Sequence, residues 1–321
     1  MSPNKSLLKI IKQNHGFKIV HDDIELELGK SISSDQAIDL FESIGISLIQ
    51  NGNSYEFREI DFLDKKLIRE KIDQIEGSSD IQLAVEQIID TTSRFFSNED
   101  IEKYQYSICF AEFQAQGRGR GKNMWLSPYG SGICFSILGS LPHKFSPLGL
   151  SIYCGIIVVR ILRELGFKDV SLKWPNDLVH KGSKLGGILT ELTSQHEEKY
   201  EFNIGIGINY NLGSDLNSME QNLFPPTDLM KIHNGTDISR SEISGTLAKA
   251  IIESLKNVDQ KKIQEAFKSW PELDALYQKE IKIIDDDQNL EGKNVGIDDN
   301  GALLLDTSGV IKKIYNGHLV I

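Results

Sequence analysis

A glycine-rich segment with three cations is the part of the sequence whose residue types most clearly predict chemistry. In the segment QAQGRGRGKNMW, residues 114–125, three glycines alternate with three cationic side chains, in the order Gly117, Arg118, Gly119, Arg120, Gly121 and Lys122. Glycine lets the backbone approach a ligand closely, and guanidinium and ammonium groups bind phosphate or carboxylate. The segment does not match the GxxxxGK[ST] pattern of a P-loop. It predicts an anion-binding loop, and a solvated turn or an RNA-contacting segment are the alternatives.

A lysine at the expected end of a strand is the second candidate. Residues 170–174 alternate apolar and polar side chains, and Pro175 ends the strand because it has no N–H to donate. Lys173 therefore lies where it can enter a cleft, although most lysines are ordinary surface residues. Asn176 and Asp177 follow at once and suit either a metal–phosphate contact or a simple turn.

Two further stretches combine apolar alternation with glycine. Residues 200–209 alternate strictly, and Gly205, Gly207 and Asn209 fall on the less apolar face. The stretch 184–192 contains Gly186 and Gly187, and residues 193–198 would join the two strands as a hairpin. Glycine weakens a strand, so its presence indicates that something approaches the backbone closely. The two strands are expected to form a flat slot for a planar ring, with a tight crossing of helix over sheet as the alternative.

The elements that must position these residues fall into four expected parts, with bounds at 1–60, 61–79, 80–272 and 273–321. In the first, a capping box at Ser33 and Gln36 starts a helix, and Asn51-Gly52 turns a hairpin. Helices followed by a hairpin are the pattern of a winged helix. The second part has an apolar stripe at helical spacing and predicts a linker helix.

The third part mixes helices and strands. Ser146-Pro147 starts a helix that Gly166 ends, and its apolar spacing predicts that one face is buried against a sheet. In the fourth part, several short strands between 281 and 314 are separated by turns, one of them at 285–287. This pattern favours a small β-barrel.

Composition excludes several classes of protein. The 321 residues are 40% hydrophobic and 25% charged, which is ordinary for a folded chain of two or three domains. The net charge of −11 opposes binding to nucleic acid and anionic membranes, so a polyanion must meet a local basic patch. The three cysteines form no CxxC pair, and no His/Cys cluster predicts zinc. We expect a cytoplasmic protein without a membrane span.

Four motifs in this order resemble bacterial biotin protein ligases: Gly117-Arg-Gly-Arg120 with Trp125, Lys173-Trp-Pro-Asn-Asp177, Lys184-Leu-Gly-Gly-Ile188 and Gly205-Ile-Gly-Ile-Asn209. Residues 89–93 resemble the first biotin-contact segment of that family, and residues 296–304 resemble its C-terminal barrel. The resemblance covers about 83–321. It implies an α+β fold with a mixed-sheet, class II synthetase-like catalytic domain, a winged-helix-like N-terminal module and an SH3-like C-terminal barrel.

The resemblance implies a two-step reaction. The biotin carboxylate attacks the α-phosphate of ATP, giving biotinyl-adenylate and pyrophosphate. A lysine of a biotin carboxyl carrier protein then takes the biotin and releases AMP. Fixed cations in a site shielded from water would offset the repulsion between the two anions. Mg²⁺ is expected to bind through the phosphates, with Asn176 or Asp177 as candidate protein ligands.

The resemblance also implies the role of each site residue. Lys173 and Arg118 would carry the catalysis, with Lys173 bridging the carboxylate and the α-phosphate. The expected biotin site contains Thr91, Thr92, Ser93, Gln114, Gly117, Arg118, Gly119, Arg120, Trp125, Lys173, Gly186, Gly205 and Gly207. The expected ATP site contains Arg118, Arg120, Lys122, Asn123, Trp125, Asn176, Lys184 and Asn209.

The chain departs from the family pattern at three places. Thr91-Thr92-Ser93 replaces the usual serine-threonine-asparagine triplet, which shortens the last side chain. Only Phe224 lies near the place of a tryptophan that stacks on adenine in some relatives. Val295 replaces a basic residue of the best-known relative.

Two alternative functions remain open. Some family members repress biotin-synthesis genes as adenylate-bound dimers, so a homodimer that binds DNA is one alternative. The expected recognition helix, 33–44, has acidic residues and no lysine or arginine, which favours weakened or lost DNA binding over retained binding. Lipoate ligases have a related catalytic domain and are the weaker alternative.

Overall fold

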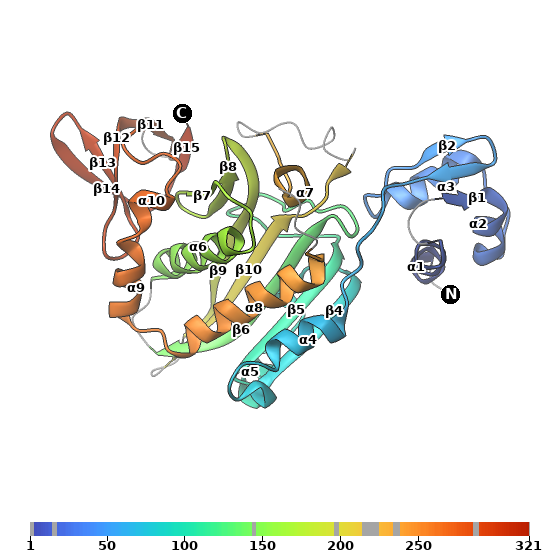
Figure 1. The fold of residues 1–321 in the computed structure, drawn as a ribbon, viewed down its shortest axis with the longest axis horizontal. Coiled ribbons are helices and arrows are strands. Elements are labelled where there is room, and N and C mark those ends of the chain that lie inside the picture. The colour runs from blue at the N-terminus through green and yellow to red at the C-terminus, as the bar shows by residue number, and fades with distance from the viewer. Residues whose placement is uncertain are drawn as a thin grey trace.

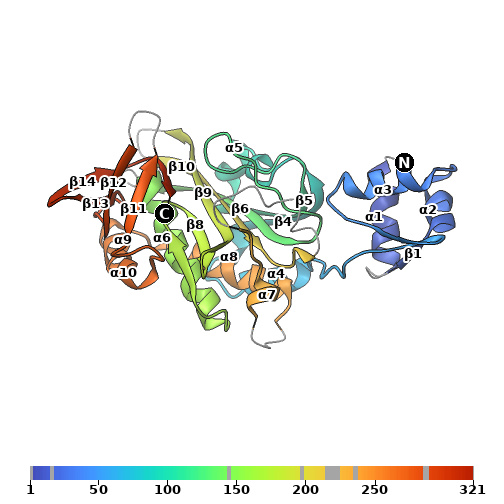
Figure 2. The same cartoon turned by 90° about the horizontal axis from the view of Figure 1, so that it is seen from above.

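The computed structural model of the chain describes residues 3–14, 18–142, 146–195, 199–213, 225–233, 238–284 and 289–320. A small N-terminal module lies at one end, a seven-stranded sheet with its helices forms the middle, and a five-stranded sheet lies at the other end (Figure 1). The view from above shows the same order along the long axis (Figure 2). The expected turn at 285–287 and Phe224 lie outside the described residues.

The described residues of the N-terminal module form three helices and a three-stranded sheet. The helices are α1 (Pro3–Gln13), α2 (His21–Leu28) and α3 (Ser34–Glu42), and the strands β1 (Lys18–Val20), β2 (Ile49–Asn51) and β3 (Ser54–Glu56) pair in the order β1-β3-β2. The capping box is confirmed, because the Gln36 N–H bonds the Ser33 hydroxyl and the Gln36 side chain accepts from the Ser33 N–H. The elements β1 and α2 were not predicted from the sequence, since α2 starts after Val20 without a side-chain cap.

The central sheet is mixed, as predicted. Its order is β4-β5-β6-β10-β9-β8-β7, formed by β4 (Ile81–Ile89), β5 (Tyr106–Gln114), β6 (Gly132–Pro142), β10 (Lys199–Asn209), β9 (Ser183–Gln195), β8 (Asp177–His180) and β7 (Val170–Lys173). Only β4 and β5 are parallel among these neighbouring pairs, and the other pairs are antiparallel. Since parallel strands end at the same edge, β4 and β5 deliver the residues that follow them to one place.

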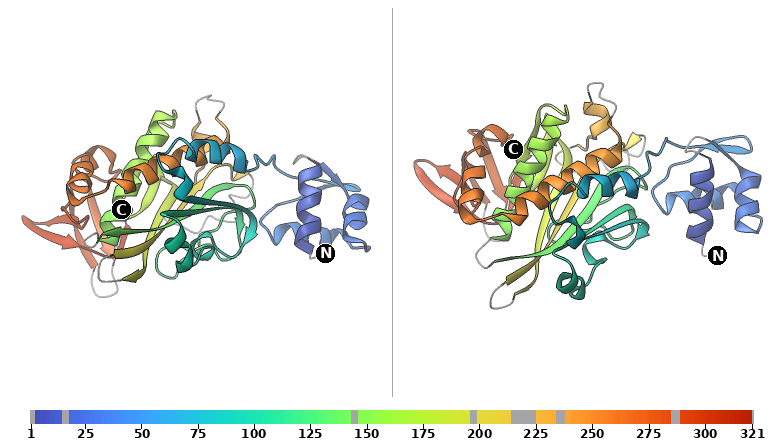
Figure 3. Two further views of the ribbon diagram at one scale, coloured as in Figure 1. Left: turned by 90° about the horizontal axis from the view of Figure 1, so that it is seen from below. Right: turned by 60° about the horizontal axis from the view of Figure 1, so that its bottom comes forward.

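Helices cover one face of this sheet (Figure 3). They are α4 (Lys65–Ile72), α6 (Pro147–Glu164) and α8 (Arg240–Lys256), followed by α9 (Gln260–Phe267) and α10 (Trp270–Leu273). The longest of them are α6 and α8. The shorter elements are η1 (Ser78–Asp80), η2 (Thr92–Arg94), α5 (Asn98–Lys103) and α7 (Leu229–Ile232). Ser146 caps α6 and Pro147 opens it, as expected.

The prediction that α6 packs one face against the sheet is confirmed, and the burial of the helix extends beyond that face. Most residues of α6 are buried, including the polar Ser151. One side of the helix packs on the sheet, where Gly155 lies against Leu172. The opposite end meets the C-terminal region, where Gly149 lies close to the Asn300 carbonyl. The apolar spacing indicated a helix correctly, but it could not show that a second layer covers it.

The C-terminal sheet is antiparallel, with the order β14-β13-β12-β11-β15. Its strands are β11 (Glu280–Ile284), β12 (Asn289–Ile297), β13 (Leu303–Thr307), β14 (Val310–Ile314) and β15 (His318–Val320). The turn after β12 is stabilised by Asp298, whose carboxylate accepts from the N–H groups of Asn300 and Ala302 at 2.9 Å each. The short strands predicted here are thus confirmed.

The N-terminal module packs against a loop of the central domain. Tyr129, in the loop before β6, is buried in the core of the module, and its N–H donates to the Ile44 carbonyl at 2.9 Å. The Tyr129 hydroxyl donates to Gln87 at 2.7 Å. Beneath this loop, Arg240 donates to both the Gly130 carbonyl and the Glu112 carboxylate. A buried ion pair therefore joins α8 to β5 next to the junction.

Three further findings concern the cysteines, the metal-ligating side chains and the helices of the described part of the chain. The cysteines Cys109, Cys134 and Cys154 are buried free thiols, and burial raises the pKa of Cys154 to about 12. No group of three His, Cys, Asp or Glu side chains is arranged to hold a metal ion among the described residues. None of the described helices is long and apolar enough to cross a membrane.

Candidate active site

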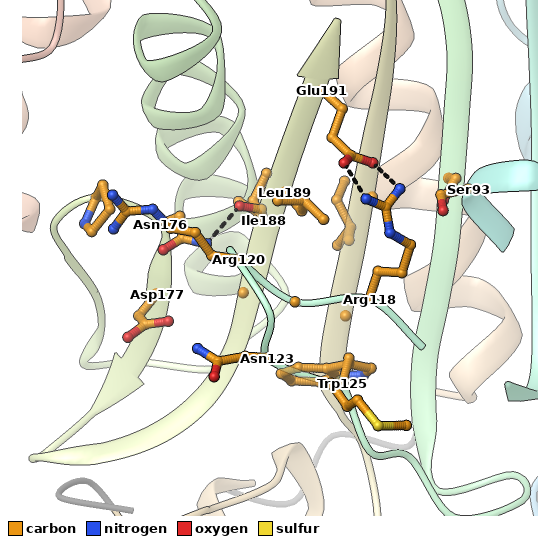
Figure 4. A pocket seen from close by; sticks show the side chains of 18 of the residues that line it. Ser93, Arg118, Arg120, Asn123, Trp125, Asn176, Asp177, Ile188, Leu189 and Glu191 are labelled. Carbon is orange, nitrogen blue, oxygen red and sulfur yellow. Dashed lines mark hydrogen bonds and ion pairs between the residues drawn. The ribbon is translucent and has the colours of Figure 1, made fainter. Parts of the chain in front are cut away.

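The cavity with the predicted residues opens between the glycine-rich loop and the strands β9 and β10 (Figure 4). Its lining contains these predicted residues: Thr91, Thr92, Ser93, Gln114, Arg118, Gly119, Arg120, Asn123, Trp125, Lys173, Asn176, Asp177, Lys184, Gly205 and Gly207. Residues far apart in the sequence therefore share one site. The lining also contains residues that were not predicted from the sequence, among them Ser136, Glu191, Gly317 and Leu319.

The glycine-rich loop folds back on itself as a small hairpin. The Trp125 N–H donates to the Gly117 carbonyl and the Gly119 N–H to the Asn123 carbonyl, both at 2.9 Å. A side chain at Gly117 would place its Cβ 2.2 Å from the Trp125 carbonyl oxygen, and Gly121 turns the hairpin with φ of +64°. The glycines therefore allow the returning strand to pack closely, and the arginines between them project from the hairpin.

The two arginines of the loop bind different parts of the molecule. Arg118 donates from both terminal nitrogens to the Glu191 carboxylate on β9, at 2.6 Å each. Arg120 donates to the Gly317 carbonyl at 3.0 Å and to the Asn316 side chain, both just before β15. The guanidinium of Arg120 also lies 6.0 Å from the centre of the Trp174 ring. The C-terminal sheet thus takes part in holding the loop.

Two lysines share one carboxylate on the opposite side of the cavity. Lys173 ends β7, is 9% exposed, and donates from Nζ to Asp177 Oδ2 at 3.0 Å. Lys184 Nζ lies 2.7 Å from the other oxygen, Oδ1. Burial of the Asp177 carboxyl opposes its ionisation, but the two ammonium groups outweigh this effect and hold its pKa below its ordinary value. The prediction that Lys173 reaches a cleft is confirmed.

The segment after β4 is held by hydrogen bonds to neighbouring strands. Gln114 Oε1 accepts from the Thr92 N–H at 2.8 Å and from the Thr92 hydroxyl at 3.1 Å. The Thr92 hydroxyl also lies 2.7 Å from that of Ser136 on β6. Gln114 and Thr91 meet because β4 and β5 are parallel and Ile89 pairs with Gln114. The result is a rim of hydroxyl and amide groups at one end of the cavity.

Of the three glycines expected to leave room for a ring, Gly205 lies as expected, and Gly207 and Gly186 do not. Gly205 faces the cavity and leaves open space, with no neighbouring atom closer than 3.7 Å to the place that a Cβ would take. The space above Gly207 is filled by Trp125, because a Cβ there would lie 2.5 Å from the indole. Gly186 is not part of the lining, since its Cβ would meet the Gly207 carbonyl at 2.5 Å, and Gly187 lines the cavity instead.

Three other predicted residues lie outside the lining. Gly117 is buried beneath Trp125, and Lys122 is exposed near the tip of the loop. Asn209 is 3% exposed and donates to the Thr227 carbonyl at 3.0 Å, so it stabilises the segment beside β10. Asn176 does line the cavity, but its side-chain nitrogen donates to the Ile188 carbonyl at 3.0 Å.

Glu191 could have been found from the sequence. In β9, strand alternation places Gly187, Leu189 and Glu191 on the face that lines the cavity. The prediction for this stretch used its glycines and did not include the carboxylate four residues after Gly187. Gly317 and Leu319 could not have been found in this way, because only the folded arrangement of the C-terminal sheet brings them to the site.

Comparison with known proteins agrees with this geometry. A profile of the biotin/lipoate A/B protein ligase family matches residues 85–209, and one of the biotin protein ligase C-terminal domain matches residues 279–318. The bifunctional ligase/repressor BirA of Escherichia coli is 31% identical over 84% of this chain and 81% of its own length. Biotin–protein ligase 2 of Arabidopsis thaliana is 31% identical over 52% of this chain and 49% of its own.

The fold comparison leads to the same family. The biotin protein ligase of Aquifex aeolicus, solved with biotin and ATP, matches with a TM-score of 0.59 and 28% identity, over 74% of this chain and 97% of its own. The chain thus has the mixed-sheet fold and the antiparallel C-terminal sheet of the ligases. It belongs to the biotin protein ligase family.

Proposed function

We propose that this protein is an ATP-dependent biotin protein ligase that acts on a biotin carboxyl carrier protein. The observation that carries the proposal is the cavity itself, into which the loop arginines and the two lysines on Asp177 converge in a chain of net charge −11. Such a site suits two anionic substrates that must be brought together. In the first step a biotin carboxylate oxygen bonds to the α-phosphorus, and the bond to the leaving pyrophosphate breaks.

Lys173 is the group proposed to stabilise this first step. It lies at the end of a rigid strand, and Asp177 fixes the position of its ammonium group. A fixed cation costs little reorganisation when charge develops between the carboxylate and the phosphate. Arg118 is proposed to assist from the other side of the cavity, and Arg120 to retain the adenylate by closing the loop.

In the second step the amine of the acceptor lysine, after losing a proton, attacks the acyl carbon of the adenylate. An amide bond forms, the acyl–phosphate bond breaks, and AMP leaves. The loop hairpin and Trp125 are proposed to shield the adenylate from water until the acceptor arrives. The rim formed by Thr91, Thr92, Ser93 and Gln114 is proposed to bind the ureido ring of biotin.

Magnesium is proposed to enter with the nucleotide. Both oxygens of Asp177 already bind lysines, and Asn176 offers one amide oxygen, so the donor set suits a cation held chiefly by phosphates. Bound there, the ion would neutralise phosphate charge. Asn176 or Asp177 is the proposed protein contact.

Biotin is preferred over lipoate as the acid substrate. The profile that matches residues 85–209 is shared by biotin and lipoate ligases, whereas the C-terminal profile belongs to biotin ligases. An adenylation assay in which biotin and lipoate compete for the full-length protein tests this choice. We expect pyrophosphate release with biotin, and little inhibition by lipoate at equal concentration.

The direct test of the proposed function is transfer to a carrier domain. Full-length protein, biotin, Mg²⁺ and ATP are incubated with a biotin carboxyl carrier domain, and the acceptor is analysed by intact mass spectrometry. We expect one biotin added per carrier and AMP released in equal amount. A carrier of unchanged mass, together with no biotin-dependent pyrophosphate, would rule out the proposal.

The N-terminal module is proposed to be a winged helix that has weak or no affinity for DNA. The Escherichia coli relative, described as a ligase and repressor, favours the DNA-binding alternative. Against it, Asp35, Asp39 and Glu42 are all exposed along α3, and Lys9 of α1 is paired with Glu27 at 2.7 Å. Acidic side chains facing DNA repel phosphates. The module packs on Tyr129, and we propose that this packing is its role instead.

A gel-shift experiment tests this proposal. Promoter DNA is mixed with the protein, biotin and ATP over a range of salt concentrations. We expect no adenylate-dependent, salt-sensitive complex, and the appearance of such a complex would establish the regulator instead.

We also propose the domain limits 1–60, 61–79, 80–272 and 273–321, an SH3-like closure of the C-terminal sheet, and a homodimer as the assembly to test.

A further inference from the structure

Asn203 is a buried polar residue close to the cavity that was not predicted from the sequence. It lies on β10, on the same strand face as Gly205 and Gly207, and is 4% exposed. Its side-chain nitrogen donates to the main-chain carbonyl of Ser93 at 2.5 Å. The buried amide oxygen of Asn203 has no hydrogen-bond partner among the described residues, so the nitrogen provides the contact of this side chain with the segment after β4. Asn203 therefore ties the segment after β4 to the floor of the sheet.

Glu191 lies directly beside Asn203. The antiparallel register of β9 and β10 pairs the two residues across the strands. Glu191 binds Arg118 through two hydrogen bonds of 2.6 Å. Figure 4 shows the Arg118 guanidinium between the Glu191 carboxylate and Ser93. The two neighbours thus hold two different segments, the one after β4 and the glycine-rich loop.

From this juxtaposition we propose that Asn203 and Glu191 form an anchor pair of positioning residues, which fixes both segments that cover biotin. Asn203 holds the Thr91-Thr92-Ser93 segment, and Glu191 holds the glycine-rich loop through Arg118. The inference rests on the proposed function, because it assigns these segments to biotin. Neither residue reacts, and each acts through the segment that it holds.

The partial exposure of the second contact supports a functional rather than a structural role. The Arg118 and Glu191 side chains are 36% and 28% exposed. Ion pairs with this much solvent contribute little to folding stability. Their bidentate geometry nevertheless fixes the direction of the guanidinium. Loss of the Glu191 contact should therefore change ligand binding more than it changes the free energy of unfolding.

The test at Asn203 uses two substitutions. Asn203→Ala removes the amide, and Asn203→Asp keeps its shape but replaces the donor by an acceptor. We expect both variants to bind biotin about 3- to 10-fold more weakly by calorimetry, the effect of one lost hydrogen bond. Hydrogen exchange of the amides at 91–95 should accelerate in the ligand-free variants.

The control is Asn294→Ala, because Asn294 is also a buried asparagine that donates to a main-chain carbonyl, that of Leu276 at 3.0 Å, and in addition to Asp274 at 2.7 Å. It lies on β12, away from the cavity. We expect this control to lower the unfolding temperature while biotin affinity stays at the wild-type value. Equal weakening by Asn294→Ala, or wild-type affinity in both Asn203 variants, would overturn the role of Asn203.

The test at Glu191 measures retention of the adenylate. Glu191→Gln should release biotinyl-adenylate about 3- to 10-fold faster than wild type, the effect of one weakened charge-assisted contact, and Glu191→Asp should recover part of the loss because it keeps the charge. Unchanged release in Glu191→Gln would overturn its role. If the wild type itself does not bind biotin, the proposed function fails, and amide exchange at 91–95 and 117–125 still decides whether the pair anchors these segments.

Discussion

Two arginine–glutamate pairs in this protein have the same chemistry and different surroundings. Arg240 and Glu112 are both fully buried at the junction of the N-terminal module with the central sheet. Arg118 and Glu191 lie partly exposed at the cavity. A buried pair that loses one partner leaves an uncompensated charge, whereas an exposed pair is replaced by water. Burial therefore predicts that the first pair maintains the fold and that the second one positions a ligand-binding loop.

The two regions are linked through β5. Glu112 and Gln114 are two residues apart on this strand and project from the same face. Glu112 Oε1 also accepts from the Leu63 N–H at 2.6 Å, and this hydrogen bond connects the segment before α4 to β5. The strand thus carries one residue of the junction and one of the cavity rim. This proximity makes the comparison testable, because damage at the junction must be separated from damage at the site.

The largest expected effect is on stability, at the buried pair. Glu112→Ala leaves the Arg240 guanidinium buried without its carboxylate, which should lower the free energy of unfolding by about 3–5 kcal/mol. Urea denaturation measures this change. The double variant Glu112→Leu/Arg240→Met should recover much of the loss, because well-packed apolar side chains often replace a buried pair. A Glu112→Ala variant as stable as wild type would remove the distinction between the two pairs.

The next largest effect is on catalysis, at Lys173. Lys173→Ala removes the cation proposed to bridge the carboxylate and the α-phosphate, so biotin-dependent pyrophosphate release should fall at least about 100-fold. The circular dichroism spectrum should stay that of wild type, since the lysine lies at the end of a strand. Pyrophosphate release at the wild-type rate would show that Lys173 has no catalytic role.

A smaller effect is expected at Arg120. Arg120→Gly loses the bonds to Asn316 and Gly317 and the contact with Trp174, so the adenylate should leave about tenfold faster. Leakage is measured as biotin on bystander lysines of an added protein. Asn316→Ala, which removes only one of these bonds, should show a weaker version of the same effect. If Arg120→Gly retained the adenylate as well as wild type does, the contacts between the loop and the C-terminal region would have no role in loop closure.

The smallest effect concerns pH and Asp177. Its pKa in the folded protein is below the ordinary value of 3.8, so its ion pairs stabilise the fold above that pH and are lost as the pH falls through the folded pKa. Asp177→Asn should therefore be less stable than wild type by about 1–2 kcal/mol at pH 7. The difference in unfolding free energy should shrink toward zero below pH 3.8. A constant difference would assign the loss to packing rather than to charge.

The sequence was most informative where local pattern decides structure. The alternation around Gly205 and Gly207, the capping box at Ser33 and the strand end at Lys173 are all local features, and the structure confirms each of them. The convergence of the loop and Lys173 on one cavity is confirmed as well. That convergence was expected from the family resemblance, because spacing along the chain does not specify it.

The sequence was least informative where distant segments meet. Gly187 lines the cavity in place of the predicted Gly186. This depends on which face of β9 points toward the cavity next to β10. In the sequence, Asn203 looks like any other polar residue of an alternating strand. Only the folded structure shows that its side chain binds the Ser93 carbonyl. The contact of Arg120 with Asn316 joins residues 196 positions apart. Each of these requires the packed structure, since tertiary contacts decide them.

Calorimetric titration of biotin into the full-length protein, with and without a non-hydrolysable ATP analogue, tests the central claim most directly. That claim is that one cavity with fixed cations holds the acid and the nucleotide together. It predicts one biotin site per chain and tighter binding of the analogue once biotin is bound. Absence of biotin binding at millimolar concentration, or mutual exclusion of biotin and the analogue, would contradict it.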